Sequence, residues 1–191
     1  MRIIAGKDRG RKLFDCSKLK SLRPTTDSNR ENLFNILKSS RTLREIGFKL
    51  ENSDLLDVFC GSGTISFEAL SRGVRSATLI DNNFSHLEVA KKNALLLNSQ
   101  NIEFYQMDAL KINPFSNKKY NFIFIDPPYQ KNMAIISLNS INSANLISDK
   151  ALIVIESSKT EDLVLDENKF TLLDKRKYGM TVFYFLIPTT K

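Results

Sequence analysis

From residue 54 onward, short apolar runs alternate with stretches in which apolar residues recur at helical spacing. Strands are predicted at residues 55–59, 77–80, 102–105, 120–125 and 151–155, helices at 64–71, 84–98 and 133–147, and a closing strand pair at 170–176 and 180–187. Such alternation favours parallel strands joined by right-handed helical crossovers. We therefore predict an α/β fold with a mostly parallel, doubly wound sheet and an antiparallel closing strand.

Acidic side chains stand where a doubly wound sheet binds its ligands, at the carboxyl ends of its strands. The first strand carries Asp57 into a glycine turn, the second ends at Asp81, and Asp108 and Asp126 follow the third and fourth strands. One aspartate at a strand end is commonly only a helix cap or a turn residue. Four of them, each at a strand end, predict a shared ligand site at this edge of the sheet.

The turn Cys60-Gly61-Ser62-Gly63 lets the backbone approach a ligand closely, because two of its positions lack a Cβ atom. We expect Cys60 to matter through its main chain. Dinucleotide sites usually have a third glycine three positions after the second, where this chain has Ser66, and this disfavours a diphosphate ligand. Asp81 stands about 20 residues after the first glycine, where a carboxylate typically accepts from ribose hydroxyls.

Two further carboxylates complete the predicted ligand. Asp108 could accept from an adenine amino group, and Asp57 could receive a cationic amino group directly or through water. The ligand then has adenine, ribose and an ammonium group but no phosphate, a description that S-adenosylmethionine meets. The sequence therefore predicts a Rossmann-like, S-adenosylmethionine-dependent methyltransferase fold that needs no metal.

The tetrapeptide Asp126-Pro127-Pro128-Tyr129 directly follows the apolar fourth strand. The prolines remove two backbone donors, so the turn offers carbonyls, a carboxylate and an aromatic face. These acceptors suit the two N–H groups of an exocyclic amine on a nucleobase, and Tyr129 could stack on that base. We predict that Asp126, Pro127, Pro128 and Tyr129 hold the amine that is methylated, the alternative being a plain strand-ending turn.

The positive charge of the chain is concentrated at its beginning. Residues 1–30 hold nine basic and three acidic side chains, a net +6, whereas the remaining residues have a net charge of only +1. Residues 2–6 and 11–14 predict a basic β-hairpin, and a helix over about 28–39 follows Pro24. This arm could bind phosphates or be a solvated face, and charge alone leaves both open.

Composition limits the class of protein. With 191 residues and 42% apolar content, we expect one domain, with 1–30 as the hairpin and arm and 54–191 as the catalytic sheet. The longest apolar run, 182–187, is too short to span a membrane. Two cysteines make no disulfide framework or zinc cluster, and no secretory segment is evident, so a cytoplasmic protein is expected. We expect the lone histidine, His86, at the surface.

The chain resembles bacterial 16S ribosomal RNA guanine-N2 methyltransferases of the RsmD type over nearly its whole length. The resemblance is carried by RIIAG with RGRKL (2–6 and 9–13), LRPTTD with RE and LFN (22–27, 30–31 and 33–35), DVFCGSG (57–63), EALSRG (68–73) and DPPY (126–129). Beyond Tyr129 only Val154-Ile155-Glu156 and the length agree. The resemblance therefore bears on function mainly through the first two thirds of the chain.

This resemblance implies methyl transfer from S-adenosylmethionine to N2 of one guanine in 16S rRNA, within an assembling small ribosomal subunit. It implies that cofactor is bound by Asp57, Cys60, Gly61, Gly63, Asp81, Asp108 and Ala109. It implies that the guanine amine is held by residues 126–129, and that RNA is gripped by Arg9, Arg11, Lys12 and Arg23. We expect a monomer.

Three other activities remain open. An N6-adenine methyltransferase acting on RNA or DNA can share the Asp-Pro-Pro-Tyr turn, although the amino-terminal signature favours guanine. Protein-glutamine methyltransferases have Asn rather than Asp at the position that corresponds to Asp126, and they need no basic arm. A non-catalytic RNA-binding assembly factor would keep the sheet only as a scaffold, and the complete set of cofactor and turn residues disfavours it.

Overall fold

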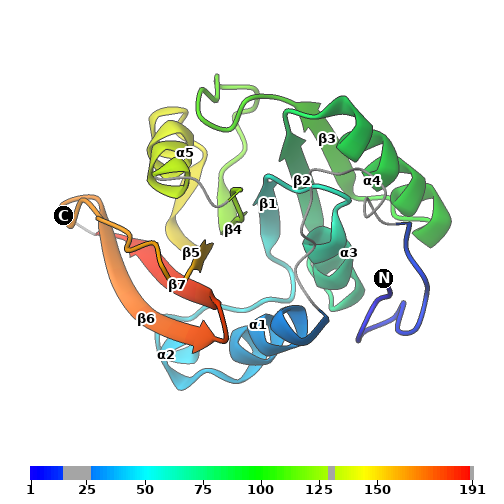
Figure 1. Ribbon diagram of the computed structural model, residues 1–191, viewed down its shortest axis with the longest axis horizontal. Coiled ribbons are helices and arrows are strands. Elements are labelled where there is room, and N and C mark those ends of the chain that lie inside the picture. Colours follow the sequence, from blue (N-terminus) through cyan, green and yellow to red (C-terminus); the bar gives the residue numbers. More distant parts are fainter. Residues whose placement is uncertain (15–26, 129–131, 190–191) are drawn as a thin grey trace.

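A computed structural model describes residues 1–14, 27–128 and 132–189 of the chain. Within them, seven strands form one sheet in the order β3-β2-β1-β4-β5-β7-β6 (Figure 1). Strands β1 to β5 pair in parallel, and β7 runs antiparallel to both β5 and β6. From β1 the sheet continues through β2 to β3 on one side, and from β4 it continues through β5 on the other, so the strand order reverses between β1 and β4. Sheets of this kind bind ligands at the carboxyl ends of the strands at such a switch point.

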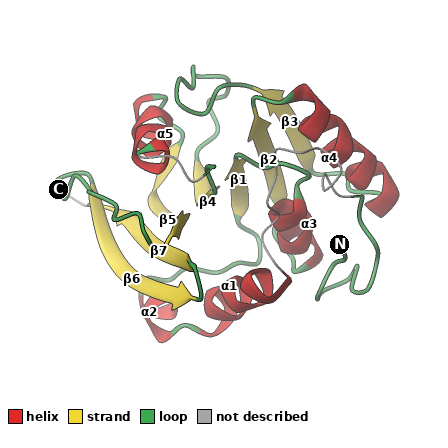
Figure 2. Ribbon diagram, viewed as in Figure 1, coloured by secondary structure: helices red, strands yellow, loops and turns green. Residues whose placement is uncertain are grey.

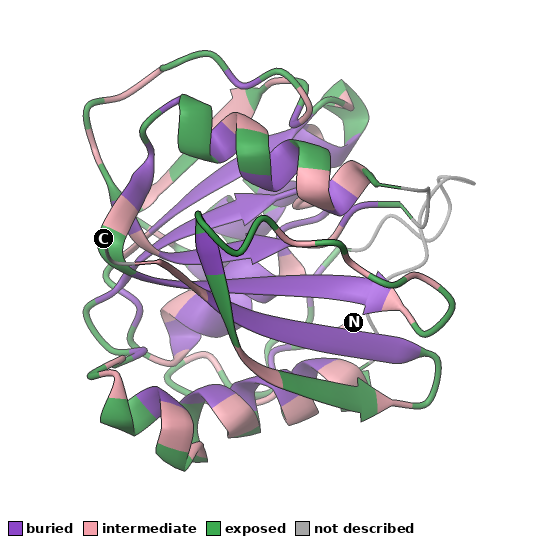
Figure 3. Ribbon diagram, turned by 90° about the vertical axis from the view of Figure 1, so that its left-hand side faces the viewer, coloured by how far each residue is buried: buried purple, intermediate pink, exposed green. Residues whose placement is uncertain are grey.

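The strands are short at the centre of the sheet and longer at the closing edge. Their bounds are β1 Asp54–Val58, β2 Ser76–Asp81, β3 Ile102–Gln106, β4 Tyr120–Ile125, β5 Ile147–Ser158, β6 Phe170–Tyr178 and β7 Thr181–Pro188. Every residue of β1 is buried, as expected for a parallel strand covered on both faces. The edge strand β6 is largely exposed (Figure 3). Its sequence includes the basic residues Lys175, Arg176 and Lys177.

Helices cover both faces of the sheet (Figure 2). Their bounds are α1 Asp27–Ser39, α2 Arg41–Glu45, α3 Thr64–Ser71, α4 Phe84–Leu97 and α5 Met133–Ser143. The first four pack on one face, where Phe34, Leu43 and Ala90 join the core that includes Leu55. On the opposite face α5 and the loop after β3 pack over a second core that includes Leu56. Neighbouring residues of β1 thus enter different cores, as the alternation of side chains along a strand requires.

The predicted doubly wound α/β fold is confirmed, while several element ends differ from the prediction. The predicted helix 133–147 ends at Ser143, because Asn145 adopts a left-handed φ of 56°. Strand β5 begins at Ile147 instead of 151. The short helix α2 was not predicted, and the Ser40 side chain caps it by accepting from the Leu43 N–H.

The amino-terminal segment, residues 1–14, doubles back on itself without forming a strand. Arg2 and Lys12 make one isolated antiparallel bridge, and Ile3 N–H donates to the Arg11 carbonyl at 3.0 Å. The predicted β-hairpin is therefore not confirmed. The two halves of the segment do not pair further because the backbone between them binds α3 instead. For example, Lys7 N–H donates to the Ser71 carbonyl at 2.9 Å. The segment lies beside α3 and α4 (Figure 1).

Within the described ranges, no helix is long and apolar enough to cross a membrane.

Candidate active site

The turn after β1 is a tight loop with positive φ values at Phe59, Gly61 and Gly63. Gly61 and Gly63 have positive φ values of 55° and 76°, a region that L-residues seldom adopt. A Cβ on Gly63 would lie 2.7 Å from Cε2 of Phe67 and 2.8 Å from Cδ2 of Leu79. The absence of a side chain at Gly63 is thus needed both by the backbone and by the packing of α3 against β2.

Asp81, the last residue of β2, is tied directly to this turn. Its Oδ2 accepts from Gly61 N–H at 2.9 Å, and its Oδ1 accepts from Asn83 N–H at 2.8 Å. The residue is only 6% exposed. These bonds bring together two of the predicted cofactor residues, Gly61 and Asp81, which are 20 positions apart in sequence.

Asp57 lies in β1 beneath the turn and is almost completely buried. Its Oδ2 accepts from Ser66 Oγ at 2.6 Å. Burial, aided by the negative charge of Asp81 and opposed by the Ser66 hydrogen bonds, raises the pKa of Asp57 to about 7. A cation placed beside Asp57 would favour its ionised form, so this carboxyl group is suited to a positively charged ligand.

The loop after β3 contributes Asp108 and Ala109. Met107 N–H donates to the Asp81 carbonyl at 3.1 Å, which places the start of this loop beside the end of β2. Asp108 is exposed, and its Oδ1 accepts from Leu110 N–H at 2.9 Å, whereas Ala109 is buried. The backbone therefore brings the Asp108 position to the same edge of the sheet as Asp81.

The predicted substrate turn follows β4. Asp126 N–H donates to the Val58 carbonyl at 3.3 Å, so this turn starts next to the end of β1. Asp126 is half-buried, Pro127 is buried and Pro128 is exposed. Tyr129 lies outside the described residues. The structure thus places the Asp126 turn and the glycine turn at the ends of adjacent strands.

The predicted RNA-binding residues have different surroundings. Arg9 and Lys12 are exposed on the amino-terminal segment, and Arg23 lies outside the described residues. Arg11 is also exposed, but its guanidinium group donates to the Leu96 carbonyl of α4 and pairs with Asp8 at 3.1 Å. Arg11 therefore also attaches the segment to the carboxyl end of α4, where a positive charge is favourable.

A buried carboxylate on α3 fixes the same segment. Glu68 is 0% exposed and accepts from Ile4 N–H at 2.7 Å and Ala5 N–H at 3.0 Å. Arg72 donates to it at 2.7 Å, and Nε of the fully buried Arg30 lies 3.7 Å away. No role for these side chains was predicted from the sequence, because a buried ion pair between α1 and α3 leaves no local pattern.

Two side chains at the candidate site were missed. His86 was expected at the surface, and this is wrong: it is 6% exposed, with Nδ1 3.3 Å from both carboxylate oxygens of Asp81. Asn93 of α4 is 0% exposed, and its amide group bonds to both backbone groups of Phe14 and to the Ser62 carbonyl at 3.1 Å. Their positions on the inner face of α4 were the available signal.

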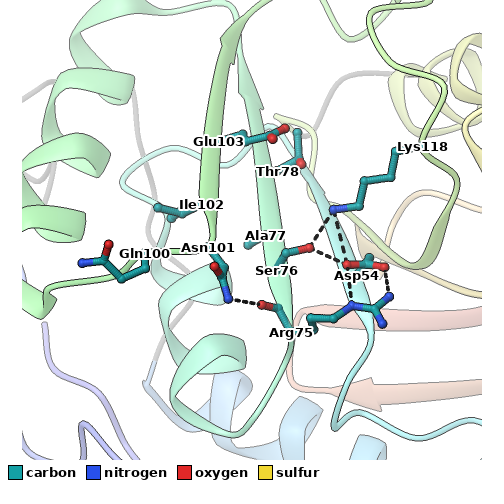
Figure 4. Close-up of a pocket in the computed structure, with 10 residues that line it drawn as sticks. All are labelled: Asp54, Arg75, Ser76, Ala77, Thr78, Gln100, Asn101, Ile102, Glu103 and Lys118. Carbon is teal, nitrogen blue, oxygen red and sulfur yellow. Dashed lines mark hydrogen bonds and ion pairs between the residues drawn. The ribbon is translucent and has the colours of Figure 1, made fainter.

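A polar groove lies at the opposite edge of the sheet, at the amino ends of β1, β2 and β3 (Figure 4). It has a volume of about 400 Å³ and is lined by Asp54, Arg75, Ser76, Ala77, Thr78, Gln100, Asn101, Ile102, Glu103 and Lys118. Arg75 pairs with Asp54, and Lys118 Nζ lies 3.3 Å from Asp54 and 2.7 Å from Ser76 Oγ. Asp54 and Glu103 balance the charges of Arg75 and Lys118, and the contacts of Asp54 join the amino ends of these strands.

Among residues 1–14, 27–128 and 132–189, no group of three or more His, Cys, Asp or Glu side chains could hold a metal ion.

A sequence model of the family described as Conserved hypothetical protein 95 matches residues 1–187. The chain is 32% identical over 189 residues to ribosomal RNA small subunit methyltransferase D of Buchnera aphidicola subsp. Acyrthosiphon pisum, covering 98% of this chain and 93% of that protein. It is 34% identical to the protein of the same name in Escherichia coli K12, over 96% of this chain and 87% of that one.

A solved structure shares the whole fold. The putative methyltransferase yhhF from Escherichia coli superimposes with a TM-score of 0.81 at 28% sequence identity, covering 100% of this chain and 99% of that chain. The predicted Rossmann-like methyltransferase fold is thereby confirmed, as is the resemblance on which the sequence analysis relied.

Proposed function

Since the chain belongs to the Conserved hypothetical protein 95 family, the RsmD type, we propose that it is an S-adenosylmethionine-dependent rRNA methyltransferase. The proposal is supported by relatives named ribosomal RNA small subunit methyltransferase D. We further propose that the target is the exocyclic N2 amine of a guanine in 16S rRNA, presented by an assembling small subunit.

One observation carries the cofactor part of this proposal: Asp57 and Asp81 are buried on either side of a glycine turn whose Gly61 N–H is held by Asp81 at 2.9 Å. These two carboxylates fit S-adenosylmethionine, because Asp81 can accept from ribose hydroxyls and Asp57 suits a cation. We assign to Asp108 the role of accepting from the adenine amino group. We assign to Gly63 a close contact between its backbone and the cofactor. The cofactor supplies an electrophilic methyl group on a sulfonium sulfur.

We assign the amine to the turn that starts at Asp126. Its carboxylate and the Pro127 carbonyl would accept the two N–H groups of the guanine N2, which orients the nitrogen lone pair toward the methyl group. This nitrogen would receive the methyl group that the bound sulfonium supplies, leaving a neutral thioether, and its surplus proton would pass to Asp126 or to water. Tyr129 would stack on the base and hold it out of its own stack.

The RNA would be gripped by the exposed basic side chains Arg9, Arg11 and Lys12 of the amino-terminal segment, together with Arg23. Contacts of Lys and Arg with phosphate give affinity without base specificity. The Asp126 turn would then supply the recognition of the base.

A methyl-transfer assay on small subunits that lack the modification tests this function. Radiolabelled S-adenosylmethionine should transfer its methyl group, and nucleoside analysis of the product should give N2-methylguanosine. Asp126→Ala should reduce single-turnover methylation about 100-fold to 1000-fold, as losing a preorganised acceptor in an active site typically does, while cofactor affinity is retained. Asp81→Ala should instead weaken cofactor binding. An N6-methyladenosine product would overturn the guanine assignment, and no methylation of any RNA would overturn the enzyme assignment.

A further inference from the structure

His86 lies against the carboxylate to which we have assigned the cofactor ribose. It is the third residue of α4 and only 6% exposed, and its Nδ1 is 3.3 Å from both Oδ1 and Oδ2 of Asp81. Its Nε2 is 3.2 Å from Nδ2 of Asn83. The imidazole ring therefore lies between the helix cap of α4 and the end of β2.

The hydrogen bonds around Asn83 determine which ring nitrogen of His86 carries the proton. Asn83 caps α4, and its Oδ1 accepts from Ser85 N–H at 2.9 Å. Its Nδ2 must then face His86, and because an amide nitrogen can only donate, Nε2 of His86 must accept. The proton of the neutral ring is therefore on Nδ1, where it donates to Asp81.

This donor can control the orientation of the Asp81 carboxylate. Rotation about the last torsion of an aspartate is soft, so a carboxylate keeps one plane only if several donors hold it. Gly61 N–H binds Oδ2 and Asn83 N–H binds Oδ1, while His86 Nδ1 is equidistant from both oxygens. The three donors together fix the plane of the carboxylate and the direction of its remaining lone pairs.

We propose that His86 is a positioning residue that orients the remaining acceptor site of Asp81 toward a hydroxyl of the cofactor ribose. This inference rests on the proposed function. It gives a role to a side chain that would act on the cofactor indirectly, by holding Asp81. His86 should therefore contribute to cofactor affinity only when the ribose hydroxyls are present. That condition separates positioning from a general effect on the fold.

The test measures binding of two probes by calorimetry: S-adenosylhomocysteine and its 2′,3′-dideoxy analogue. His86→Ala and the similarly sized His86→Leu both remove the donor and should weaken binding of S-adenosylhomocysteine about tenfold, the loss expected for one hydrogen bond to a charged group. Binding of the dideoxy analogue should change less than twofold. His86→Asn places an amide N–H near the position of Nδ1 and should restore most of the affinity.

Lys92→Ala, at an exposed position of the same helix, is the matched control and should leave both affinities unchanged. Equal losses for the two probes in a folded His86 variant would overturn the positioning role, as would an unchanged affinity for S-adenosylhomocysteine. In both of those cases the parent chain still binds the cofactor product, so the proposed function stands. A parent chain that binds neither probe would overturn the proposed function and the inference together.

Discussion

Replacing Gly63 by alanine should destabilise the protein at the glycine turn. Gly63 has a φ of 76°, and an added Cβ would lie 2.7 Å from the ring of Phe67 and 2.8 Å from the side chain of Leu79. Both neighbouring side chains are 0% exposed. They cannot swing into solvent to make room, so the backbone of the turn or the packing of α3 on β2 must shift.

The expected loss has two physical parts. A left-handed conformation costs a non-glycine residue about 1–2 kcal/mol. Forcing a methyl group into a well-packed core adds about 1–3 kcal/mol. The two together predict that Gly63→Ala lowers the free energy of unfolding by about 2–5 kcal/mol. Gly179 in the β6–β7 turn is the matched control: its φ is 60° and an added Cβ meets nothing within 4 Å. Gly179→Ala should therefore lose only the first, conformational part.

Urea unfolding of the parent chain and both variants measures this difference. Gly63→Ala should shift the unfolding midpoint well below that of Gly179→Ala, with the slope unchanged in both. Calorimetry should also show weaker S-adenosylmethionine binding in Gly63→Ala alone, since only that turn belongs to the proposed cofactor site. Equal stability losses in the two variants would refute the packing argument, because backbone strain alone would then explain both.

Three further predictions concern charged groups. The pKa of Asp57 is raised from an ordinary 3.8 to about 7, so between these pH values the folded chain binds a proton that the unfolded chain has lost. The free energy of unfolding should therefore fall by up to about 1.4 kcal/mol per pH unit as pH rises from 4 to 7. Asp57→Asn should flatten that slope in urea titrations at several pH values, and an unchanged slope would contradict the assignment. Glu68→Gln removes one of the two carboxylates beside the buried Arg30, leaving only the half-exposed Asp27 at 3.0 Å, and should cost about 1–3 kcal/mol in unfolding free energy; a loss below about 1 kcal/mol would show that the pair is not needed. Arg9→Ala with Lys12→Ala should reduce the slope of log RNA affinity against log salt by about 1 per lost phosphate contact and leave cofactor affinity unchanged; a retained slope would make the segment a solvated surface.

Local pattern determined the order of the elements and the place of the candidate site. Apolar runs of strand length and helical periodicity are properties of a few consecutive residues, so the strands that became β1 to β4 and the helices α3 and α4 were predicted within one or two residues of their ends. The glycine turn and Asp81 were likewise found from spacing. Topology then requires the carboxyl ends of parallel strands to meet at one edge, whichever side chains lie between them.

Only the tertiary structure decided which side chains these residues contact. Gly61 donates to Asp81, 20 positions away, and His86 is buried against the same carboxylate, 5 positions away. Arg11 binds α4 at Leu96, 85 positions away. The amino-terminal segment failed to form strands for the same reason, since Glu68 and Ser71 take up its backbone donors. Sequence shows which groups can donate, accept or carry charge, but partner choice, burial and pKa depend on chain segments brought together by packing.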